Sequence, residues 1–384
     1  MAATVISTTP PQRPAEASLL QFVLYFLRLG CFGFGGPIAL VGYMQKDLVE
    51  ERHWIAQQDY LDGLAFSQLA PGPLAAQLAM YLGFVRAGFL GATVVGVAFI
   101  LPSFLMVAAI GEVYVHLGGT KIIAALFYGI GAAVIGIIAR SALKLGKASL
   151  KNDWLLWGVF FVLALSTAFF ERENVWLFLA AGFLVMLVRA TPLPWKPRHA
   201  MWLLTPLSLG TSKTAALFAF FLKASLFVFG SGLAIVPFLH GGVVQEHHWL
   251  TEEQFLDAVA VAMITPGPVV ITAGFIGYLV AGFPGACAAA LGVFLPVYLF
   301  VVLLGPSYKR FSQNKQIRSF VQGVTAAATG AIAGAVIVLA KHSVRDYWTL
   351  GIAVATFLVL TKWKVPEPII IVIAGGLGAA LRLG

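Results

Sequence analysis

Residues 26–44 read FLRLGCFGFGGPIALVGYM, and residues 221–239 read FLKASLFVFGSGLAIVPFL. Both segments are apolar enough to enter a membrane, yet both carry glycines near their middle. They align without a gap at an offset of 195 residues. The same offset carries the PGP triplet at 71–73 onto the one at 266–268. Chance similarity between apolar helices does not produce matches of Trp, Asp, Glu, His and PGP in the same order. The chain therefore contains an internal duplication.

The composition is that of a membrane protein. The 384 residues are 60% hydrophobic and 11% charged, and the mean hydropathy is +0.90. So few polar residues do not cover the surface of a water-soluble globule. Residues 258–307 contain no Asp, Glu, Lys, Arg or His, a stretch longer than the roughly 20 residues that a spanning helix needs. We predict an all-α, multi-pass protein of the cell membrane.

The charge pattern and the motifs exclude several other classes of function. The formal net charge is +9, but the basic residues form short clusters between apolar runs, not the contiguous basic face that nucleic acid requires. Cys31 and Cys287 both lie in apolar segments, so we expect neither a disulfide nor a cysteine metal site. The HExxH, GxSxG and P-loop motifs are absent. We therefore expect no enzymatic activity, cofactor, metal or nucleic-acid partner, and the lipid bilayer as the surrounding medium.

The duplication divides the chain into two repeats. We predict a disordered tail over residues 1–17, without a cleavable-signal pattern, and a first transmembrane repeat over 18–190. The polar stretch at 191–213 is expected to be a cytoplasmic linker, and a second transmembrane repeat follows over 214–384.

The basic connectors predict the relative orientation of the repeats. In the first repeat, connector 112–121 carries one Lys and connector 140–151 carries four basic residues. In the second repeat, 309–318 carries four and 341–345 carries two. Equivalent connectors therefore have opposite charge bias, which under the positive-inside rule indicates two inverted-topology repeats. We favour five crossings per repeat plus a re-entrant or broken-helix hairpin at PGP, with both chain ends outside.

Broken helices at matched positions of two inverted repeats indicate the substrate site of a secondary transporter. Backbone groups freed at a break must face protein, water or a ligand, and the positive N-terminal end of a half-helix favours an anion. Pro37 suits the first turn of a restarted helix, while Gly33, Gly35 and Gly36 allow positive φ and close approach to a ligand. The alternative is that Gly and Pro only permit close packing and kinks. Because two types of motif occur at matched positions in both repeats, we favour a role in substrate binding over a role in packing alone.

Matched charged residues accompany these motifs. Arg28 and Lys223 lie about two turns before the breaks, where a cation needs a partner or a role. The alternative is that their long stems carry the charge to the membrane surface. Asp62 and Asp257 lie on the helices that run into PGP and are candidates for carrying a coupling proton, because a buried carboxyl group resists ionisation. They could equally cap or tether the connectors.

The predicted substrate site combines both breaks, both PGP turns and the two matched cations. Its residues are Arg28, Gly33, Phe34, Gly35, Gly36, Pro37, Pro71, Gly72, Pro73, Lys223, Phe229, Gly230, Ser231, Gly232, Pro266, Gly267 and Pro268. No catalytic residue is assigned.

Three features of the sequence are specific enough to compare with a known family. They are the FGGP motif at 34–37, the two PGP triplets, and the charged, Trp-containing connector that follows FLRLGCFGFGG. The chain resembles the chromate ion transporter family in its long, two-domain form, over about residues 19–380. The resemblance implies alternating-access export of chromate across the bacterial cytoplasmic membrane, with sulfate as a chemically similar oxyanion. Composition and spacing alone reach only a secondary transporter for an anion. A carrier of sulfate or another oxyanion, a passive anion channel and a homodimeric assembly stay open.

The two copies of the break differ at one point. The second reads FGSGLA where the first reads FGGPIA, so Ser231 replaces Gly36 and Gly232 replaces Pro37. The second break lacks the proline that presets a helix start, although Ser231 could supply an N-cap hydroxyl. We hypothesise that the halves are unequal and that the first break makes the tighter contacts with the anion.

Overall fold

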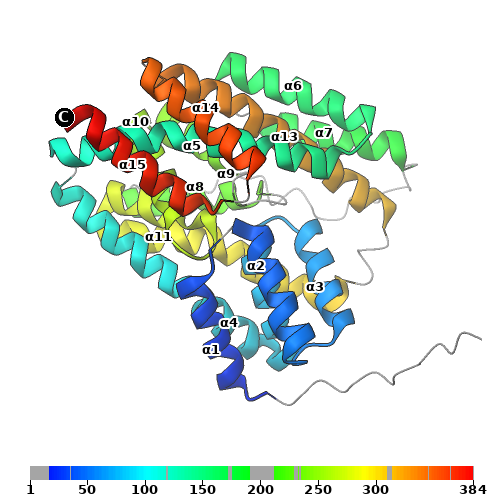
Figure 1. Cartoon of the computed structure of the whole chain (residues 1–384). Coiled ribbons are helices and arrows are strands. Elements are labelled where there is room, and N and C mark those ends of the chain that lie inside the picture. The colour runs from blue at the N-terminus through cyan, green and yellow to red at the C-terminus, as the bar shows by residue number, and fades with distance from the viewer. Residues whose placement is uncertain are drawn as a thin grey trace, which may run out of the picture.

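A computed structural model describes residues 17–34, 36–117, 120–171, 175–190, 212–228, 232, 235–308, 314–344, 346–363 and 365–383. Most of the predicted N-terminal tail and of the predicted linker lies outside these ranges. Every regular element within them is helical, as predicted for an all-α protein (Figure 1). The first half contains α1 (Leu19–Phe32), α2 (Gly36–Met44), η1 (Gln45–Glu51), α3 (Gln57–Leu69), α4 (Leu74–Leu117), α5 (Lys121–Leu150), α6 (Trp154–Phe170) and α7 (Val175–Arg189). The second half contains α8 (Lys213–Ser225), α9 (Ile235–Leu239), η4 (His240–Glu246), α10 (Glu252–Ile264), η5 (Val269–Ile271), α11 (Thr272–Leu304), η6 (Gly305–Ser307), α13 (Lys315–Ser343), α14 (Tyr347–Lys362) and α15 (Glu367–Leu383).

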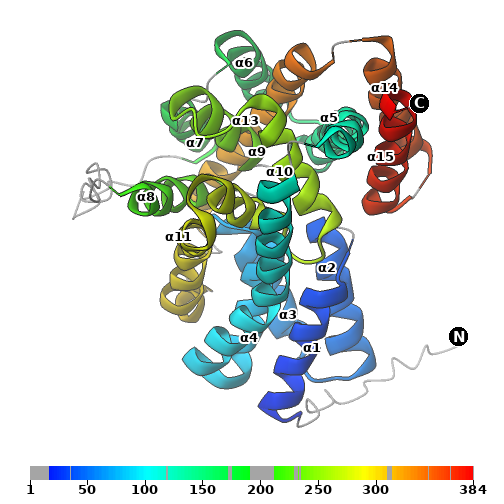
Figure 2. The ribbon, with the colours of Figure 1, turned by 90° about the vertical axis from the view of Figure 1, so that its left-hand side faces the viewer.

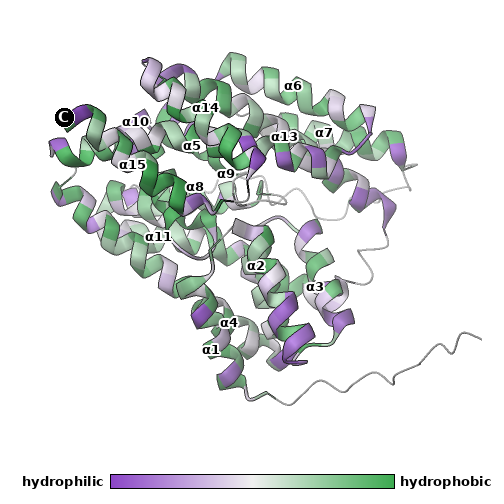
Figure 3. Ribbon diagram, viewed as in Figure 1, coloured by the Kyte–Doolittle hydropathy of each residue, from purple (hydrophilic) through white to green (hydrophobic). Residues whose placement is uncertain are grey.

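The helices have the length and polarity of membrane spans. In the part of the chain that the structure describes, α4, α5, α13 and the helical run Val269–Ser307 are each long and apolar enough to cross a bilayer. Shorter apolar helices, among them α1, α6 and α14, accompany them. Figure 3 shows hydrophobic residues along these helices and many of the polar residues near helix ends. Large apolar side chains such as Phe169 and Phe170 are exposed, which suits contact with lipid.

The two halves repeat the same elements in the same order. Helix α10 falls on α3 when the repeats are aligned and has the same length, and the π-helix η4 falls on η1 in the same way. His53 and His248 follow these π-helices, both with positive φ, 52° and 50° respectively. Each ring nitrogen Nδ1 lies 2.8 Å from a backbone carbonyl one turn earlier. The duplication read from the sequence is thus repeated in local backbone geometry.

Helix α4 doubles back on itself at a short turn. Ala87 and Gly88 leave helical geometry, and Gly88 has φ +57° and ψ −143°, a conformation that only glycine adopts readily. Gly83 and Gly91 on the two sides of this turn pack so closely that neither could carry a side chain. Helix α11 has the same turn at Gly282, with φ +63° and ψ −157°.

The segment before this turn forms a hairpin with PGP at its tip. Helix α3 runs antiparallel to the first part of α4, since the Phe66 ring stacks on the Tyr81 ring with centroids 5.6 Å apart. Gly63, one turn earlier, also faces Tyr81 and leaves no space for a side chain. The close pairing of these two short helices places residues 71–73 at the buried end of the hairpin.

The remaining helices of the two halves are interleaved. Helix α5 of the first half packs against α14 and α15 of the second, and α13 of the second half packs against α6 and α7 of the first (Figure 2). Glycines permit these close approaches. A side chain at Gly136 would meet the Ala353 carbonyl, and one at Gly330 would overlap the Phe160 carbonyl. The two repeats therefore do not form separate lobes.

Candidate functional site

The first break lies between α1 and α2. Gly33 caps α1 and donates its N–H to the Leu29 carbonyl over 2.7 Å. Helix α2 restarts at Gly36, which has φ +73° and open space where a side chain would stand. Pro37 is the second residue of this helix, a position where its missing N–H costs no intrahelical hydrogen bond. Gly33 is buried, whereas Phe34 is exposed.

The second break follows α8. Beyond the end of this helix the chain turns to Val228, whose N–H donates to the Ser225 carbonyl over 3.3 Å. Helix α9 begins at Ile235 and runs directly into η4. Gly232 lies against Val269, just beyond the PGP turn of the same half. Among the predicted site residues, Gly35, Phe229, Gly230 and Ser231 lie outside the described residues.

The two PGP turns are buried except for the half-buried Pro71, and their glycines have positive φ. Gly72 has φ +134° and Gly267 has φ +97°. Pro71 and Pro73 stand between α3 and α4, while Pro266 and Pro268 stand between α10 and η5. The prolines limit helix continuation on both sides, and the glycine supplies the left-handed conformation that the turn requires.

Each PGP turn is hydrogen-bonded to the break of the other half. The Gly72 N–H donates to the Val228 carbonyl over 2.6 Å, and the Gly267 N–H donates to the Gly33 carbonyl over 3.0 Å. The alignment of the repeats carries Gly33 onto Val228 and Gly72 onto Gly267, so the two bonds are equivalent. We call the place where these four residues meet the crossing point. It brings together both breaks and both PGP turns, which are far apart in the sequence.

Side chains from α4 and α11 cover the crossing point. A side chain at Gly267 would lie 2.7 Å from the Ser103 Oγ, and one at Gly72 would lie 2.9 Å from the Val297 Cγ2. Gln77 also packs over Gly72 and donates through Nε2 to the Pro71 carbonyl over 2.8 Å. Ser103 and Gln77 are both fully buried. Sequence reasoning missed these residues, although Gln77 is an isolated polar residue in an apolar run and Ser103 follows Pro102.

The two matched cations do not enter the crossing point. The side chains of Arg28 and Lys223 are exposed on α1 and α8, whereas Gly33 and Val228 beyond them are buried. This placement favours the alternative given above, in which the long stems carry the charge towards a membrane surface or an aqueous space. Within the described residues, the groups that contact the crossing point are backbone groups and the neutral side chains of Gln77, Ser103 and Val297.

The two matched acids have different surroundings. Asp257 is buried, with 7% of its surface exposed, and accepts a hydrogen bond from the Tyr114 hydroxyl over 2.6 Å. Asp62 is only half-buried and accepts from the Gln58 amide over 2.8 Å. From Gly83 onward the offset between the repeats is 194 residues, one fewer than at PGP, which makes Tyr308 the counterpart of Tyr114. Tyr308 lies near α3, with its ring edge against Phe66.

Asp257 and Tyr114 line a cavity of about 650 Å³. Its walls come from α4, α5, α10, α13, α14 and α15, and its charged lining includes Lys121, Glu253 and Arg382. The Arg382 guanidinium lies over the Tyr128 ring at 4.3 Å. Because acidic groups balance the basic ones, this cavity is not an obvious anion site. It gives the Asp257 carboxyl group a neighbouring space that water can fill.

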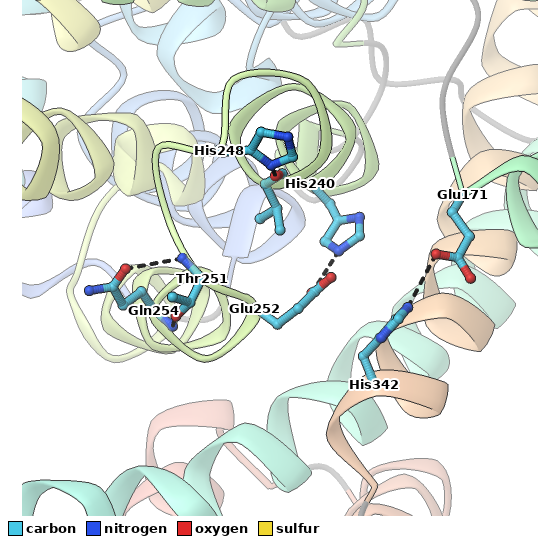
Figure 4. A network of polar contacts seen from close by, with 8 residues as sticks. Glu171, His240, His248, Thr251, Glu252, Gln254 and His342 are labelled. Atoms are coloured by element: carbon cyan, nitrogen blue, oxygen red, sulfur yellow. Dashed lines mark hydrogen bonds and ion pairs between the residues drawn. The ribbon is translucent and has the colours of Figure 1, made fainter.

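A polar network lies beside this cavity at the start of α10 (Figure 4). His240 of η4 is almost fully buried, and its Nε2 lies 2.7 Å from the Glu252 carboxylate. Glu171 at the end of α6 accepts from Lys341 over 2.8 Å and lies 3.2 Å from the His342 Nε2. Hydrogen bonds from Lys341 and His342 hold the pKa of Glu171 below its usual value.

The described residues contain no group of three or more His, Cys, Asp or Glu side chains arranged to hold a metal ion. What they do contain is a duplicated set of broken helices that meet at a buried point in a multi-pass helical membrane protein. That arrangement is typical of membrane transporters.

Comparison with known proteins identifies the transporter family. The chromate transporter family profile matches residues 20–186 and again residues 215–379. The chain is 56% identical to the chromate transport protein of Cupriavidus metallidurans, over 98% of this chain and 97% of that protein. It is 54% identical to the probable chromate transport protein of Synechococcus elongatus, covering 93% and 94% of the two chains. It is 32% identical to the chromate transport protein of Pseudomonas aeruginosa, covering 96% and 93%.

The chain belongs to the chromate transporter family and is a multi-pass protein of a bacterial membrane. No solved structure matches it.

Proposed function

We propose that this protein exports chromate across the bacterial inner membrane by alternating access, and that the oxyanion binds at the crossing point. The reciprocal hydrogen bonds between Gly72 and Val228 and between Gly267 and Gly33 carry the proposal. They join the breaks of each half to the PGP turn of the other, so movement of one half against the other must disturb them. Family membership supports chromate as the substrate.

The binding groups in this proposal are backbone N–H groups. The first N–H groups of a helix have no partner within that helix, and its N-terminal end carries partial positive charge. Helices α2 and α4 both begin next to the crossing point, at Gly36 and Leu74. Opening either glycine–carbonyl bond adds one more donor. A tetrahedral oxyanion accepts hydrogen bonds from several directions and matches such a set of donors.

Alternating access follows if the two repeats are inverted. Tyr114 and Asp257 line the cavity at the N-terminal half of α10, and we assign this cavity to one side of the membrane. In inverted repeats, the matched Tyr308 and Asp62 belong to the opposite side. The same rearrangement, carried out by the other repeat, then opens the opposite side. The inside-negative membrane potential favours outward movement of an anion, and Asp257 is our candidate for carrying a coupling proton.

The test is transport by the purified protein in liposomes, with chromate, sulfate and molybdate compared at several imposed pH gradients and potentials. We expect saturable chromate flux, counter-exchange of labelled chromate and weaker transport of the other two anions. Flux that neither saturates nor exchanges would identify a passive anion channel. Sulfate transport without chromate transport or competition would show that the substrate is another oxyanion.

A further inference from the structure

Gln77 presents an unpaired hydrogen-bond acceptor beside the crossing point. The residue is fully buried, and among the described residues its Oε1 has no partner. Its Nε2 faces the Pro71 carbonyl at 2.8 Å. Because that carbonyl can only accept, the amide cannot be turned around without placing two oxygens together. Burying an unpaired acceptor costs about 1–3 kcal/mol, so its retention calls for an explanation.

The surroundings of this oxygen favour an anion that still carries a proton. Gln77 lies in the first turns of α4 and folds back over Gly72, next to the N–H groups at the start of the helix. Those N–H groups attract an oxyanion. A fully ionised oxyanion has only acceptors and would be repelled by Oε1. A singly protonated one has a single O–H that can donate to it.

We propose that the Gln77 Oε1 accepts the O–H of a singly protonated tetrahedral oxyanion, so that the site selects hydrogen chromate over sulfate. This inference rests on the proposed binding of the oxyanion at the crossing point. Hydrogen chromate loses its last proton near neutral pH, whereas hydrogen sulfate is a strong acid and is fully ionised there. A site that hydrogen-bonds a particular O–H discriminates strongly against a ligand that lacks it, since the buried acceptor then stays unpaired.

The second half does not repeat this feature. Its residue at the position of Gln77 is Thr272, whose hydroxyl already donates its hydrogen to the Val269 carbonyl over 2.7 Å. Of these two matched residues, only Gln77 has a buried side-chain oxygen that lacks any partner among the described residues. The test variant is Gln77→Met, because methionine keeps the length of the side chain and removes its hydrogen-bonding groups. Thr272→Val is the matched control.

The experiment measures equilibrium binding of chromate to the purified full-length protein below and above the last ionisation of chromate. Sulfate and selenate, both fully ionised, serve as competitors. For the wild type we expect the apparent chromate affinity to fall about tenfold per pH unit above that ionisation, in proportion to the protonated fraction. We expect selenate and sulfate to compete at least about 100-fold more weakly than chromate.

In Gln77→Met we expect the preference for chromate over selenate to fall by about tenfold or more, while Thr272→Val keeps the wild-type preference. Tyr81 lies one turn after Gln77 on α4, and its titratable neighbours are Asp59 and Asp62 on α3 and Tyr308 after η6. Their titration would alter binding of every anion, so the ratio of chromate to selenate isolates the protonation of the substrate itself.

Chromate binding that is independent of pH, equal competition by selenate, or an unchanged preference in Gln77→Met would each overturn the inference and leave the proposed function standing. Failure of the wild type to bind chromate at any pH would overturn both. The wild-type measurements need no variant, so they decide the question even if Gln77→Met does not fold.

Discussion

Gly72 and Gly267 are the residues on which the geometry of the crossing point depends. Both have a positive φ that disfavours other residues, and both lie against side chains that leave no space for a Cβ atom. Their N–H groups make the two bonds between halves. The neighbours of the two glycines differ, since Ser103 covers Gly267 and Val297 covers Gly72. The two PGP turns thus have equivalent backbone conformations but different side chains packed against them, a polar one at Gly267 and an apolar one at Gly72.

Gly267→Ala is expected to destabilise the protein by about 1–3 kcal/mol, because alanine is strained at positive φ and its Cβ would press on the Ser103 Oγ. Thermal unfolding in detergent measures the effect. Gly158→Ala, at an exposed helical position on α6 with open space, is the matched control and should be neutral or stabilising by up to about 1 kcal/mol. Equal stability of Gly267→Ala and the wild type would contradict this account of the turn.

Asp257→Asn is expected to abolish chromate accumulation driven by a pH gradient while leaving chromate counter-exchange intact. The asparagine side-chain oxygen can still accept the hydrogen bond from the Tyr114 hydroxyl, but asparagine cannot take up a proton. Asp62→Asn, at the more exposed matched position, should affect the coupling less. The measurement compares gradient-driven uptake with exchange in the same liposomes. Retained gradient-driven accumulation in Asp257→Asn would remove this residue from the coupling mechanism.

Two features of the helices determine how the two halves pack together. They are the sharp turns within α4 and α11 and the contact between the ends of α6 and α13. The turns at Gly88 and Gly282 reverse the chain after the short helix that begins at PGP, so that the long span that follows runs back past the crossing point. In the interleaved bundle, Glu171 ties the end of α6 to Lys341 and His342 at the end of α13. This contact joins a helix of the first half to one of the second.

Glu171→Gln is expected to lower stability at neutral pH by about 0.5–1 kcal/mol, the value of a partly exposed ion pair. The pKa of Glu171 is lowered in the folded protein, mainly by the Lys341 hydrogen bond, so the folded chain binds this proton less readily than the unfolded chain. The stabilisation is complete above the ordinary carboxyl pKa and disappears as the pH falls through the lowered value. Melting curves of the two proteins should therefore converge in acid. A constant difference at all pH values would exclude this ion pair as the cause.

In the whole molecule, the halves are interleaved and related through the crossing point. Helix α5 packs on α14 and α15, and α13 packs on α6 and α7, so each half completes the other. Two broken segments of one half alone would lack the carbonyl partners for their PGP turn. The two copies of the unit in this chain therefore depend on each other for their hydrogen bonds.

Inverted repeats predict that equivalent residues face opposite sides of the membrane. Lys121 begins α5, and Lys315 begins the equivalent helix α13 of the second half. In a variant without Cys31 and Cys287, we expect Lys121→Cys to react with a membrane-impermeant maleimide from outside the cell. Lys315→Cys should react only in inside-out vesicles, because its connector is rich in basic residues. Labelling of both from the same side would show that the repeats are parallel.

The sequence alone determined the membrane location, the helical class, the duplication, the positions of the breaks and the family. These follow from hydropathy and from Gly and Pro, whose effects on the backbone are local. Only the tertiary structure decided that the Gly267 N–H meets the Gly33 carbonyl, that Gln77 and Ser103 cover the turns, and that Asp257 is buried while Arg28 is exposed. Such contacts depend on how distant helices pack, and the local pattern of one helix does not specify which face its neighbour covers.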